Sequence, residues 1–504
     1  MIMKSSLKNI PQLITSFLLF ISFALNGQDK NYEPTWESLD NRPVPQWFSD
    51  AKFGIFIHWG PYSVPAWAPK GVYSEWYQNW LVTRKLSGNG NPSPTAVYDY
   101  HRVKFGEHFS YYNFGEMFKA EDFNPAAWAK LFSDAGAKYI VLTSKHHDGF
   151  ALWPSKEADK TWGFPWNSVS NGPHRDLIGD LAKEVRKTDL RFGLYYSLYE
   201  WYNPLWLTDT DRFVNEHFLP QVKDLINSYE PDILWSDGDW EINADRWKSP
   251  ELLAWLYNES PVKDKILVND RWGKDVRRSH GTFLTSEYGG SGNITRPWEE
   301  NRGIGFSFGY NRNEDLEDYN SAQTLILLLA DVVSHGGNLL LDIGPESNGK
   351  IPVIMQERLL QMGQWLKVNG EAIYGTQQWN NPVQWSKGKK VEAAEYKKLH
   401  KIRYLGGDFI LMQTLNPEPG MAVKEVFFTR KGTDLFAILP KYPDQQILIN
   451  DVPVTSSTKV TMLGTDKQLD WKKRGNGIIV MPARLSYSEI PCQYAWVLKI
   501  SEIR

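Results

Sequence analysis

The chain has 504 residues, of which 42% are hydrophobic and 23% are charged. This composition excludes a wholly disordered or collagen-like chain, and the length suits two to four ordinary domains, or one large barrel plus a smaller module. The net charge of −3 argues against a nucleic-acid-binding protein, which needs a basic surface. The single cysteine, Cys492, excludes an intramolecular disulfide and a cysteine-based zinc site. Aromatic residues make up 14% of the chain and serve equally to pack a core or to hold sugar rings.

The N-terminus has the pattern of an export signal. Two lysines precede an apolar run over residues 13–25, which is too short to span a bilayer core of about 30 Å. This pattern, followed by a small residue at Gly27, predicts a signal peptide over residues 1–27 with cleavage before Gln28. The alternative is a buried core helix. We expect an exported protein without membrane contact after cleavage, either periplasmic or secreted, or lysosomal in a eukaryote.

Residues 45–370 alternate short apolar runs with amphipathic stretches, which predicts a parallel sheet covered by helices. Eight strands over about 300 residues favour a TIM-like (β/α)8 barrel. A doubly wound sheet needs a Gly-rich phosphate turn after its first strand, whereas this chain has His58-Trp-Gly-Pro there. The predicted strands are 53–58, 139–143, 191–196, 232–237, 265–269, 282–287, 305–308 and 338–343. The predicted helices are 124–136, 174–185, 211–229, 321–333 and 356–368.

Two segments differ from this alternating pattern. Residues 86–118 are rich in Gly, Asn, Pro and Tyr without a clear period, which indicates a long insertion after the first strand, on the active-site face of a barrel. Beyond residue 375, short β-branched runs separated by turn residues predict an antiparallel β-sandwich. The expected organisation is therefore a signal peptide (1–27), a barrel (28–375) and a β-sandwich (376–504). The predicted sandwich strands are 423–428, 434–439, 446–449, 459–463, 477–481 and 494–500.

Nearly every predicted barrel strand ends in His, carboxylate, Arg or aromatic residues, and in barrels such residues are typically catalytic. Two chemistries fit this pattern. Glycoside hydrolysis needs two carboxyl groups, about 5–5.5 Å apart in a retaining enzyme. Metal-assisted hydrolysis would use His58, His146, His147 and Asp148 or Asp237. Adjacent residues on a strand point to opposite sides, so His146 and His147 ligate one metal only where the chain bends. The strand ends are 58–59, 145–148, 195–197, 237–240, 269–272 and 287–288.

Seven motifs occur in an order that resembles the α-L-fucosidases of glycoside hydrolase family 29. The resemblance covers roughly residues 35–375, and the predicted C-terminal β-module also fits this family. The motifs are Trp47–Gly60, Tyr73-Ser-Glu-Trp-Tyr77, Ser144-Lys-His-His-Asp-Gly-Phe150, Trp235-Ser-Asp-Gly-Asp-Trp240, Val268-Asn-Asp-Arg-Trp-Gly273, Gly303–Asn311 and Gly336–Pro345.

The resemblance implies a retaining mechanism with two carboxyl groups. Asp237 corresponds to the nucleophile, which forms a covalent glycosyl-enzyme. From the residues alone, an Asp before Gly fits a turn equally well. Glu287 corresponds to the acid/base of some members, for which a raised pKa is expected. Glu299 is the alternative acid/base, because the segment between Arg271 and Glu287 varies across the family.

The resemblance also implies a small pocket that holds a terminal deoxy sugar, which makes the enzyme exo-acting. One departure is Asp239, where many relatives have Glu, and this change bears on what lies beyond the fucose. No metal and no cofactor are implied. The corresponding substrate-binding residues are His58, Glu75, Trp76, His146, His147, Tyr196, Trp235 and Arg271.

The leading hypothesis is therefore a retaining exo-α-L-fucosidase that acts on fucosylated oligosaccharides or glycoconjugates. Two alternatives stay open: a metal-dependent hydrolase on the same barrel, and a catalytically silent fucose-binding protein. The natural glycan, its linkage and the oligomeric state, a homo-oligomer included, are not determined by the sequence.

Overall fold

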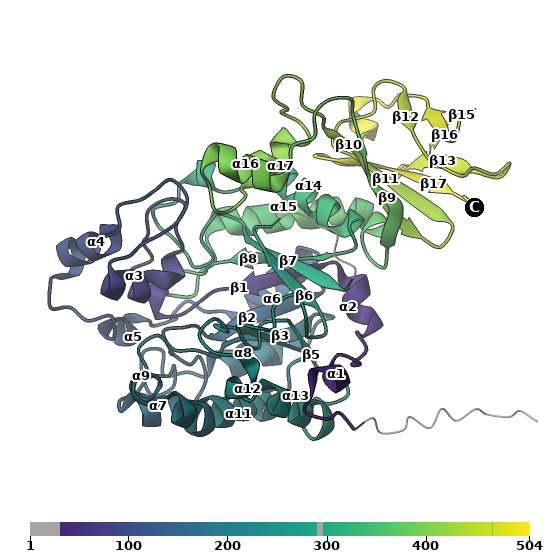
Figure 1. The fold of residues 1–504 in the computed structure, drawn as a ribbon. Coiled ribbons are helices and arrows are strands. Elements are labelled where there is room, and N and C mark those ends of the chain that lie inside the picture. Colours follow the sequence, from purple (N-terminus) through teal and green to yellow (C-terminus); the bar gives the residue numbers. More distant parts are fainter. Residues whose placement is uncertain (1–30, 290–295, 466) are drawn as a thin grey trace, which may run out of the picture.

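The computed structural model describes residues 31–289, 296–465 and 467–504. The expected signal peptide, residues 1–27, lies outside this range. Within the described range, no helix combines the length and the apolar character that crossing a bilayer requires. Figure 1 shows a barrel in the N-terminal two thirds of the chain and two smaller sheets at the C-terminal end.

The barrel sheet has eight strands in the order β5-β4-β3-β2-β1-β8-β7-β6, and every neighbouring pair is parallel. Thr282, just before β6, exchanges hydrogen bonds with Val268 of β5, at 3.0 Å to its carbonyl oxygen and 2.8 Å from its amide. These bonds bring the two end strands together, so the curled sheet is a TIM-like barrel, as predicted. The strands are β1 (Phe53–Ile57), β2 (Tyr139–Lys145), β3 (Arg191–Ser197), β4 (Ile233–Asp237), β5 (Leu267–Val268), β6 (Leu284–Glu287), β7 (Trp298–Gly303) and β8 (Asn338–Ile343).

Seven of the eight predicted barrel strands are confirmed, and the prediction of a strand at 305–308 is wrong. The seventh strand is β7, which starts at Trp298. Its sequence, Trp-Glu-Glu-Asn-Arg-Gly, lacks the apolar run expected of a barrel strand. The structure tolerates these polar residues because Glu299 and Asn301 form hydrogen bonds with other strands of the barrel. Residues 305–308 instead form a loop beside the carboxyl ends of the strands, where Phe308 lines a pocket.

Helices cover the outside of the barrel, and all five predicted helical stretches are confirmed. In α6, Asn124 accepts a hydrogen bond from the amide of Ala127 at 3.0 Å, the N-cap expected of Asn-Pro. The stretch 211–229 contains a π-helical turn, Val214–Phe218, between α10 and α11. The predicted insertion, 86–118, contains α4 and α5.

The helices as far as the end of the barrel are α1 (Trp36–Leu39), α2 (Gln46–Ala51), α3 (Tyr77–Thr83), α4 (Ala96–Phe105), α5 (Asn113–Met117), α6 (Pro125–Asp134), α7 (Lys156–Trp162), α8 (Leu177–Val185), α9 (Pro204–Thr208), α10 (Thr210–Phe213), α11 (Leu219–Tyr229), α12 (Ala244–Trp247), α13 (Ser249–Asn258), α14 (Ala322–Ser334) and α15 (Val353–Asn369).

The C-terminal region forms two antiparallel sheets, with strand orders β14-β13-β17-β11-β10-β9 and β12-β16-β15. Leu435, Val460 and Ile478 belong to the core that the two sheets share. The six predicted strands are confirmed, while the polar strands β9, β14 and β15 were not predicted. The boundary at residue 375 stays a prediction. The strands are β9 (Gln377–Trp385), β10 (Lys424–Lys431), β11 (Asp434–Leu439), β12 (Ile447–Ile449), β13 (Lys459–Met462), β14 (Gln468–Leu469), β15 (Trp471–Arg474), β16 (Gly477–Val480) and β17 (Trp496–Ser501).

The segment between β9 and β10 leaves the C-terminal sheets and carries two helices, α16 (Ala393–His400) and α17 (Gly407–Met412). In Figure 1 these helices lie over the barrel, and α17 packs against α14. The barrel and the C-terminal sheets are also joined by an ion pair of 2.7 Å between Asp331 of α14 and Lys424 of β10. The chain therefore returns to the barrel after its first C-terminal strand.

Aromatic and aliphatic side chains fill the barrel interior together with the carboxyl group of Glu299. Phe56, Tyr195 and Trp235 form an inner cluster, in which Tyr195 stacks on Trp235 at 5.7 Å between ring centroids. Glu299 of β7 lies fully buried beneath them and accepts hydrogen bonds from Tyr139 Oη at 2.5 Å and Trp235 Nε1 at 2.9 Å. Burial raises the pKa of Glu299 to about 7, although the two donors oppose the shift.

This buried acid makes stability depend on pH. Because the folded-state pKa of Glu299 lies above its ordinary value, its contribution is fully present at low pH and is lost as pH rises from about 4.5 to about 7. Each such group lowers the unfolding free energy by up to about 1.4 kcal/mol per pH unit in that window. We expect Glu299→Gln, which keeps the neutral form at every pH, to flatten the decline in unfolding free energy between pH 5 and pH 8. Urea unfolding across this range checks the slope, and parallel curves for the two proteins would contradict the assignment.

Candidate active site

A pocket of about 510 Å³ opens at the carboxyl ends of the barrel strands, a size typical of a small-ligand site. The strand ends and following loops bring together nearly all the residues predicted from the sequence. The predicted residues that line it are His58, Glu75, Trp76, His146, Trp235, Asp237, Arg271 and Glu287.

Asp237 ends β4 and is held by cations and a phenol. Its Oδ1 accepts from Arg271 Nη1 at 2.9 Å and from Arg277 Nη2 at 3.1 Å, and its Oδ2 accepts from Tyr195 Oη at 3.2 Å. His147 Nε2 lies 3.7 Å from Oδ2. Burial alone would raise the pKa of Asp237, but Arg271, His147 and Arg277 outweigh it and hold the pKa well below its usual range. Asp237 is therefore ionised throughout the physiological pH range.

The chain turns sharply directly after Asp237. Gly238 has φ of +74°, and a Cβ there would lie 2.9 Å from Ser197 Oγ. Glycine therefore fits both the conformation and the space. The Asp-Gly pair therefore forms a turn and also places the Asp237 carboxylate in the pocket, so the two interpretations of this pair do not exclude each other.

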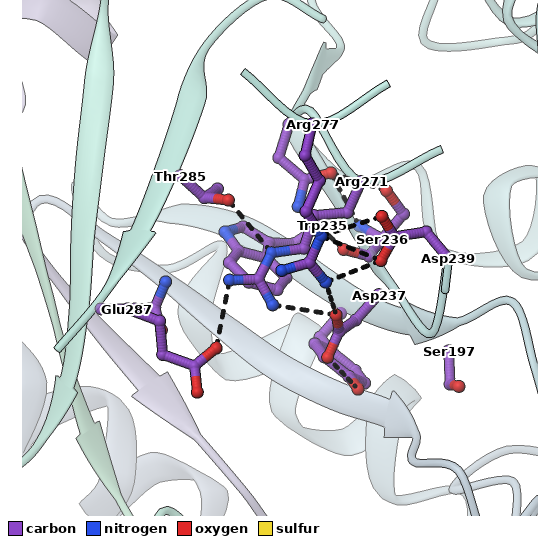
Figure 2. Close-up of polar contacts among 12 residues, drawn as sticks. Ser197, Trp235, Ser236, Asp237, Asp239, Arg271, Arg277, Thr285 and Glu287 are labelled. Atoms are coloured by element: carbon purple, nitrogen blue, oxygen red, sulfur yellow. Dashed lines mark hydrogen bonds and ion pairs between the residues drawn. The ribbon is translucent and has the colours of Figure 1, made fainter. Parts of the chain in front are cut away.

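Glu287 ends β6 and faces Asp237 across a shared arginine. Its Oε2 accepts from Arg271 Nη2 at 3.3 Å, and its Oε1 accepts from Tyr73 Oη at 2.9 Å. In Figure 2 the two carboxylates approach the Arg271 guanidinium from different sides. One quarter of the Glu287 side chain is exposed, so it lies nearer the pocket mouth than Asp237, whose side chain is 12% exposed.

Arg271 is itself fixed by its surroundings. Its Nε donates to Thr285 Oγ1 at 3.0 Å, and its guanidinium carbon lies 4.5 Å from the centroid of the Trp235 ring. The side chain is 3% exposed, so its charge is balanced by Asp237 and Glu287 rather than by water.

Three predicted histidines surround the inner part of the site. Burial lowers the pKa of His58 to about 3 and that of His147 to about 4, and it holds His146 well below its ordinary value. All three rings are therefore neutral near pH 7. His58 Nδ1 lies 2.6 Å from Asp342 Oδ1, and His147 Nδ1 lies 2.6 Å from Ser197 Oγ.

One ring nitrogen of this group, His146 Nδ1, is fully buried and has no hydrogen-bond partner among the described residues. The His147 side chain lies behind the pocket surface, where it contacts Asp237 but does not line the pocket itself. Neutral imidazoles can donate to and accept from ligand hydroxyls, so this group suits a polyol.

Glu75 and Trp76 form the opposite wall. Glu75 Oε2 accepts from the Gly309 amide at 2.9 Å and from Ser307 Oγ at 3.1 Å, so the loop wrongly predicted as a strand holds this carboxyl group. Burial raises the pKa of Glu75 to about 7. Trp76 packs against Trp240 at 5.5 Å between ring centroids and presents an aromatic face to the pocket.

Two predicted candidates lie outside the pocket. Tyr196 points out of the barrel toward the helices, where its hydroxyl donates to Gln221 at 2.7 Å, so its assignment as a substrate-binding residue is wrong. Its neighbour Tyr195 points inward and contacts Asp237, because successive side chains of a strand face opposite sides. The alternative acid/base, Glu299, lies in the barrel interior rather than along the pocket.

Sequence reasoning also missed several pocket residues. Arg277 donates to both oxygens of Asp239, at 2.9 and 2.7 Å, and thereby neutralises that buried carboxylate. Tyr73 begins the motif that contains Glu75 and Trp76, and its position two residues before Glu75 indicated that it could also line the pocket. Lys397, Arg403 and Tyr404 come from the segment between β9 and β10, and no barrel pattern predicts their place.

The arrangement combines an ionised carboxylate, a second carboxyl group nearer the mouth, neutral histidines and aromatic walls. Two carboxyl groups flanking a small pocket suit acid/base and nucleophilic chemistry at a glycosidic bond. Among the residues that the structure describes, no three His, Cys, Asp or Glu side chains are grouped so as to hold a metal ion.

Comparisons with known proteins agree with this geometry. A family model described as "Alpha-L-fucosidase" matches residues 19–371, and one described as "Alpha-L-fucosidase C-terminal domain" matches residues 421–501. The chain is 40% identical over 487 residues to human tissue α-L-fucosidase, covering 94% of this chain and 93% of that protein. It is 43% identical over 377 residues to the Dictyostelium discoideum α-L-fucosidase, covering 73% of this chain and 79% of that protein.

Solved structures show the same relationship. A Thermotoga maritima α-fucosidase in complex with a mechanism-based inhibitor superposes with a TM-score of 0.73 at 37% identity, covering 94% of this chain and all of that one. A complex of the Thermotoga maritima enzyme with fucose gives a TM-score of 0.72 at 36% identity, covering 93% of this chain and 100% of that chain. The chain therefore belongs to the α-L-fucosidases of glycoside hydrolase family 29 and is a retaining glycoside hydrolase with α-L-fucosidase activity.

Proposed function

We propose that this protein removes terminal α-L-fucosyl residues from fucosylated oligosaccharides or glycoconjugates, with Asp237 as nucleophile and Glu287 as acid/base. The observation that carries the proposal is the pair of carboxyl groups on β4 and β6, joined through Arg271 in one pocket. The fucose complex of the Thermotoga maritima relative supports the identity of the sugar. The pocket floor is closed by Trp235 and Tyr195, which favours the end of a glycan over its middle and hence exo action.

In the first step, Asp237 Oδ attacks the anomeric carbon while Glu287 donates a proton to the glycosidic oxygen, so the carbon–oxygen bond breaks and the leaving sugar departs as an alcohol. In the second step, Glu287 takes a proton from water, whose oxygen attacks the anomeric carbon and releases Asp237 as a carboxylate. Arg271 and Arg277 keep Asp237 ionised between turnovers.

Replacement of the nucleophile tests the first assignment. We expect Asp237→Gly to lower kcat for 4-nitrophenyl α-L-fucoside by at least about 10³-fold, because no covalent intermediate forms. Azide should then restore turnover by attacking from the vacated side, giving β-L-fucosyl azide, which NMR identifies. Asp239→Asn is the matched control, because it changes a neighbouring buried carboxylate without providing that vacancy. Near-wild-type activity of Asp237→Gly would contradict the assignment, and assays in EDTA would reveal the metal-dependent alternative by loss of wild-type activity.

Replacement of the acid/base tests the second assignment. We expect Glu287→Ala to lower kcat/KM for a fucosyl disaccharide by about 10² to 10⁴-fold, and to affect an aryl fucoside with a good leaving group much less. Azide should intercept the glycosyl-enzyme and give α-L-fucosyl azide, the opposite anomer from that of Asp237→Gly. Glu299→Gln serves as the comparison, since it should show neither effect once activity is corrected for folded protein. If Glu299→Gln shows the leaving-group dependence instead, the roles of the two glutamates are exchanged.

We also propose that the protein is exported, as the N-terminal pattern predicts. The supporting observation is the basic start followed by the apolar run over residues 13–25. Expression of the full chain in a bacterial host should give a periplasmic or secreted product that begins at Gln28, as shown by intact mass and N-terminal sequencing. A product retaining residues 1–27 inside the cell would contradict export.

A further inference from the structure

One wall of the pocket comes from outside the barrel. The stretch after α16 brings Arg403 and Tyr404 to the pocket, and it is fixed by Asn89 of the insertion after β1. Asn89 Oδ1 accepts from the amides of Arg403 at 2.9 Å and Tyr404 at 3.2 Å, and its Nδ2 donates to the Tyr404 carbonyl at 3.1 Å. Arg302 of β7 donates to the Leu405 carbonyl at 3.1 Å. These bonds hold the wall in place.

This wall lies beside Glu287. The Tyr404 ring packs against Tyr73 at 5.2 Å and Tyr288 at 5.7 Å between centroids, and Tyr73 donates directly to Glu287. The group that protonates the glycosidic oxygen must face the leaving sugar. The wall therefore borders the part of the substrate beyond the fucose.

Three cations line this outer part of the pocket: Arg278, Lys397 and Arg403. Arg278 and Arg403 are exposed and Lys397 is partly buried. None of the three has a carboxylate within ion-pair distance among residues 31–289, 296–465 and 467–504, whereas Arg271 and Arg277 deeper in the pocket are both paired.

The nearby carboxylates of Glu300 and Asp270 bond to groups other than these three side chains. Glu300 pairs with Arg302 at 2.5 Å, and Asp270 accepts from Thr285 Oγ1 at 2.6 Å and from the Arg278 amide at 2.9 Å. Burial and then the charge of Arg302 lower the pKa of Lys397, against a smaller opposing effect of Glu300. The outer pocket therefore presents three cations that form no ion pair within the part of the chain that the structure describes.

We propose that the leaving-group side of this pocket recognises an anionic sugar, so that the preferred substrates carry a sulfate or carboxylate on the residue next to the terminal fucose. The proposal rests on the proposed function, because it needs Glu287 to face the leaving group. Guanidinium and ammonium groups bind both anions through charge-assisted hydrogen bonds, and Tyr404 offers a flat face for the sugar ring.

The test compares matched fucosyl disaccharides in the linkage that the wild-type enzyme hydrolyses best. One pair is fucosyl-N-acetylglucosamine with and without a 6-O-sulfate, and the other is fucosyl-glucuronic acid against fucosyl-glucose. We expect kcat/KM to be about 5- to 10-fold higher for at least one anionic member, the sum of a few partly exposed charge pairs. This preference should shrink with added salt, whereas the rate for the neutral member should stay constant.

The variants Arg403→Gln, Lys397→Gln and Arg278→Gln should each lower the anionic-to-neutral ratio of kcat/KM, and the triple variant should bring it close to one. A loss of fold would reduce both rates and leave the ratio unchanged. Lys398→Gln is the matched control, because it removes an exposed charge from the same helix without lining the pocket, and the wild-type ratio should persist.

The outcomes separate the two proposals. Hydrolysis of neutral disaccharides without any anionic preference, or a preference that the three variants leave intact, would overturn the anionic subsite while leaving the fucosidase proposal standing. Failure to hydrolyse every fucoside would overturn both. Preference for the sulfated pair alone identifies a sulfate site, and preference for the uronic acid alone identifies a carboxylate site.

Discussion

The guanidinium of Arg271 is the interaction on which the site depends. It lies buried over Trp235 and bonds to both Asp237 and Glu287, two carboxyl groups that would otherwise repel each other within one pocket. Burial penalises an isolated charge heavily, but a buried cation between two acids offsets that cost through direct hydrogen bonds. The two acids that share this arginine differ in their surroundings. Asp237 lies deeper with a second arginine beside it, while Glu287 lies nearer the mouth beside Tyr73. This difference in surroundings suits the different roles proposed for the two residues, nucleophile and acid/base.

A second buried charge network supports the histidines. Lys145, directly before His146 and His147, pairs with Glu200 at 2.6 Å, and His217 lies 2.6 Å from the same carboxylate oxygen. Burial alone would raise the pKa of Glu200, but His217 and Lys145 lower it to about 2. Separating Lys145 from Glu200 would leave an uncompensated buried charge. Because Lys145 ends β2 and Glu200 follows β3, this pair fixes the ends of the two strands relative to each other. The histidine rings of the pocket are thus positioned by groups that do not line it.

In the proposed complex, the two halves of the substrate meet different parts of the chain. The proposed fucose side is built largely on strand ends, whose positions are set by the hydrogen bonds of the sheet. The leaving-group side is built from loops, including a segment that follows the first C-terminal strand and is held by Asn89, more than 300 residues earlier in the chain. A loop wall can vary among relatives while the strand ends keep the chemistry unchanged. Bond cleavage and recognition of the neighbouring sugar are therefore structurally separable in this enzyme.

The sequence by itself determined the alternation of strands and helices, and the ordered motifs indicated the family and singled out Asp237. It did not show which of Tyr195 and Tyr196 faces inward, because adjacent residues are chemically alike and only the orientation of β3 within the closed barrel separates them. It did not distinguish Glu287 from Glu299, because burial decides between a pocket acid and a core acid. It placed the seventh strand wrongly, because the polar side chains of β7, Glu299 and Asn301, find their hydrogen-bond partners on other strands only after the barrel closes. Local pattern fixes which elements form, whereas contacts between residues distant in sequence, such as Tyr404 with Tyr73, arise only when the whole chain packs.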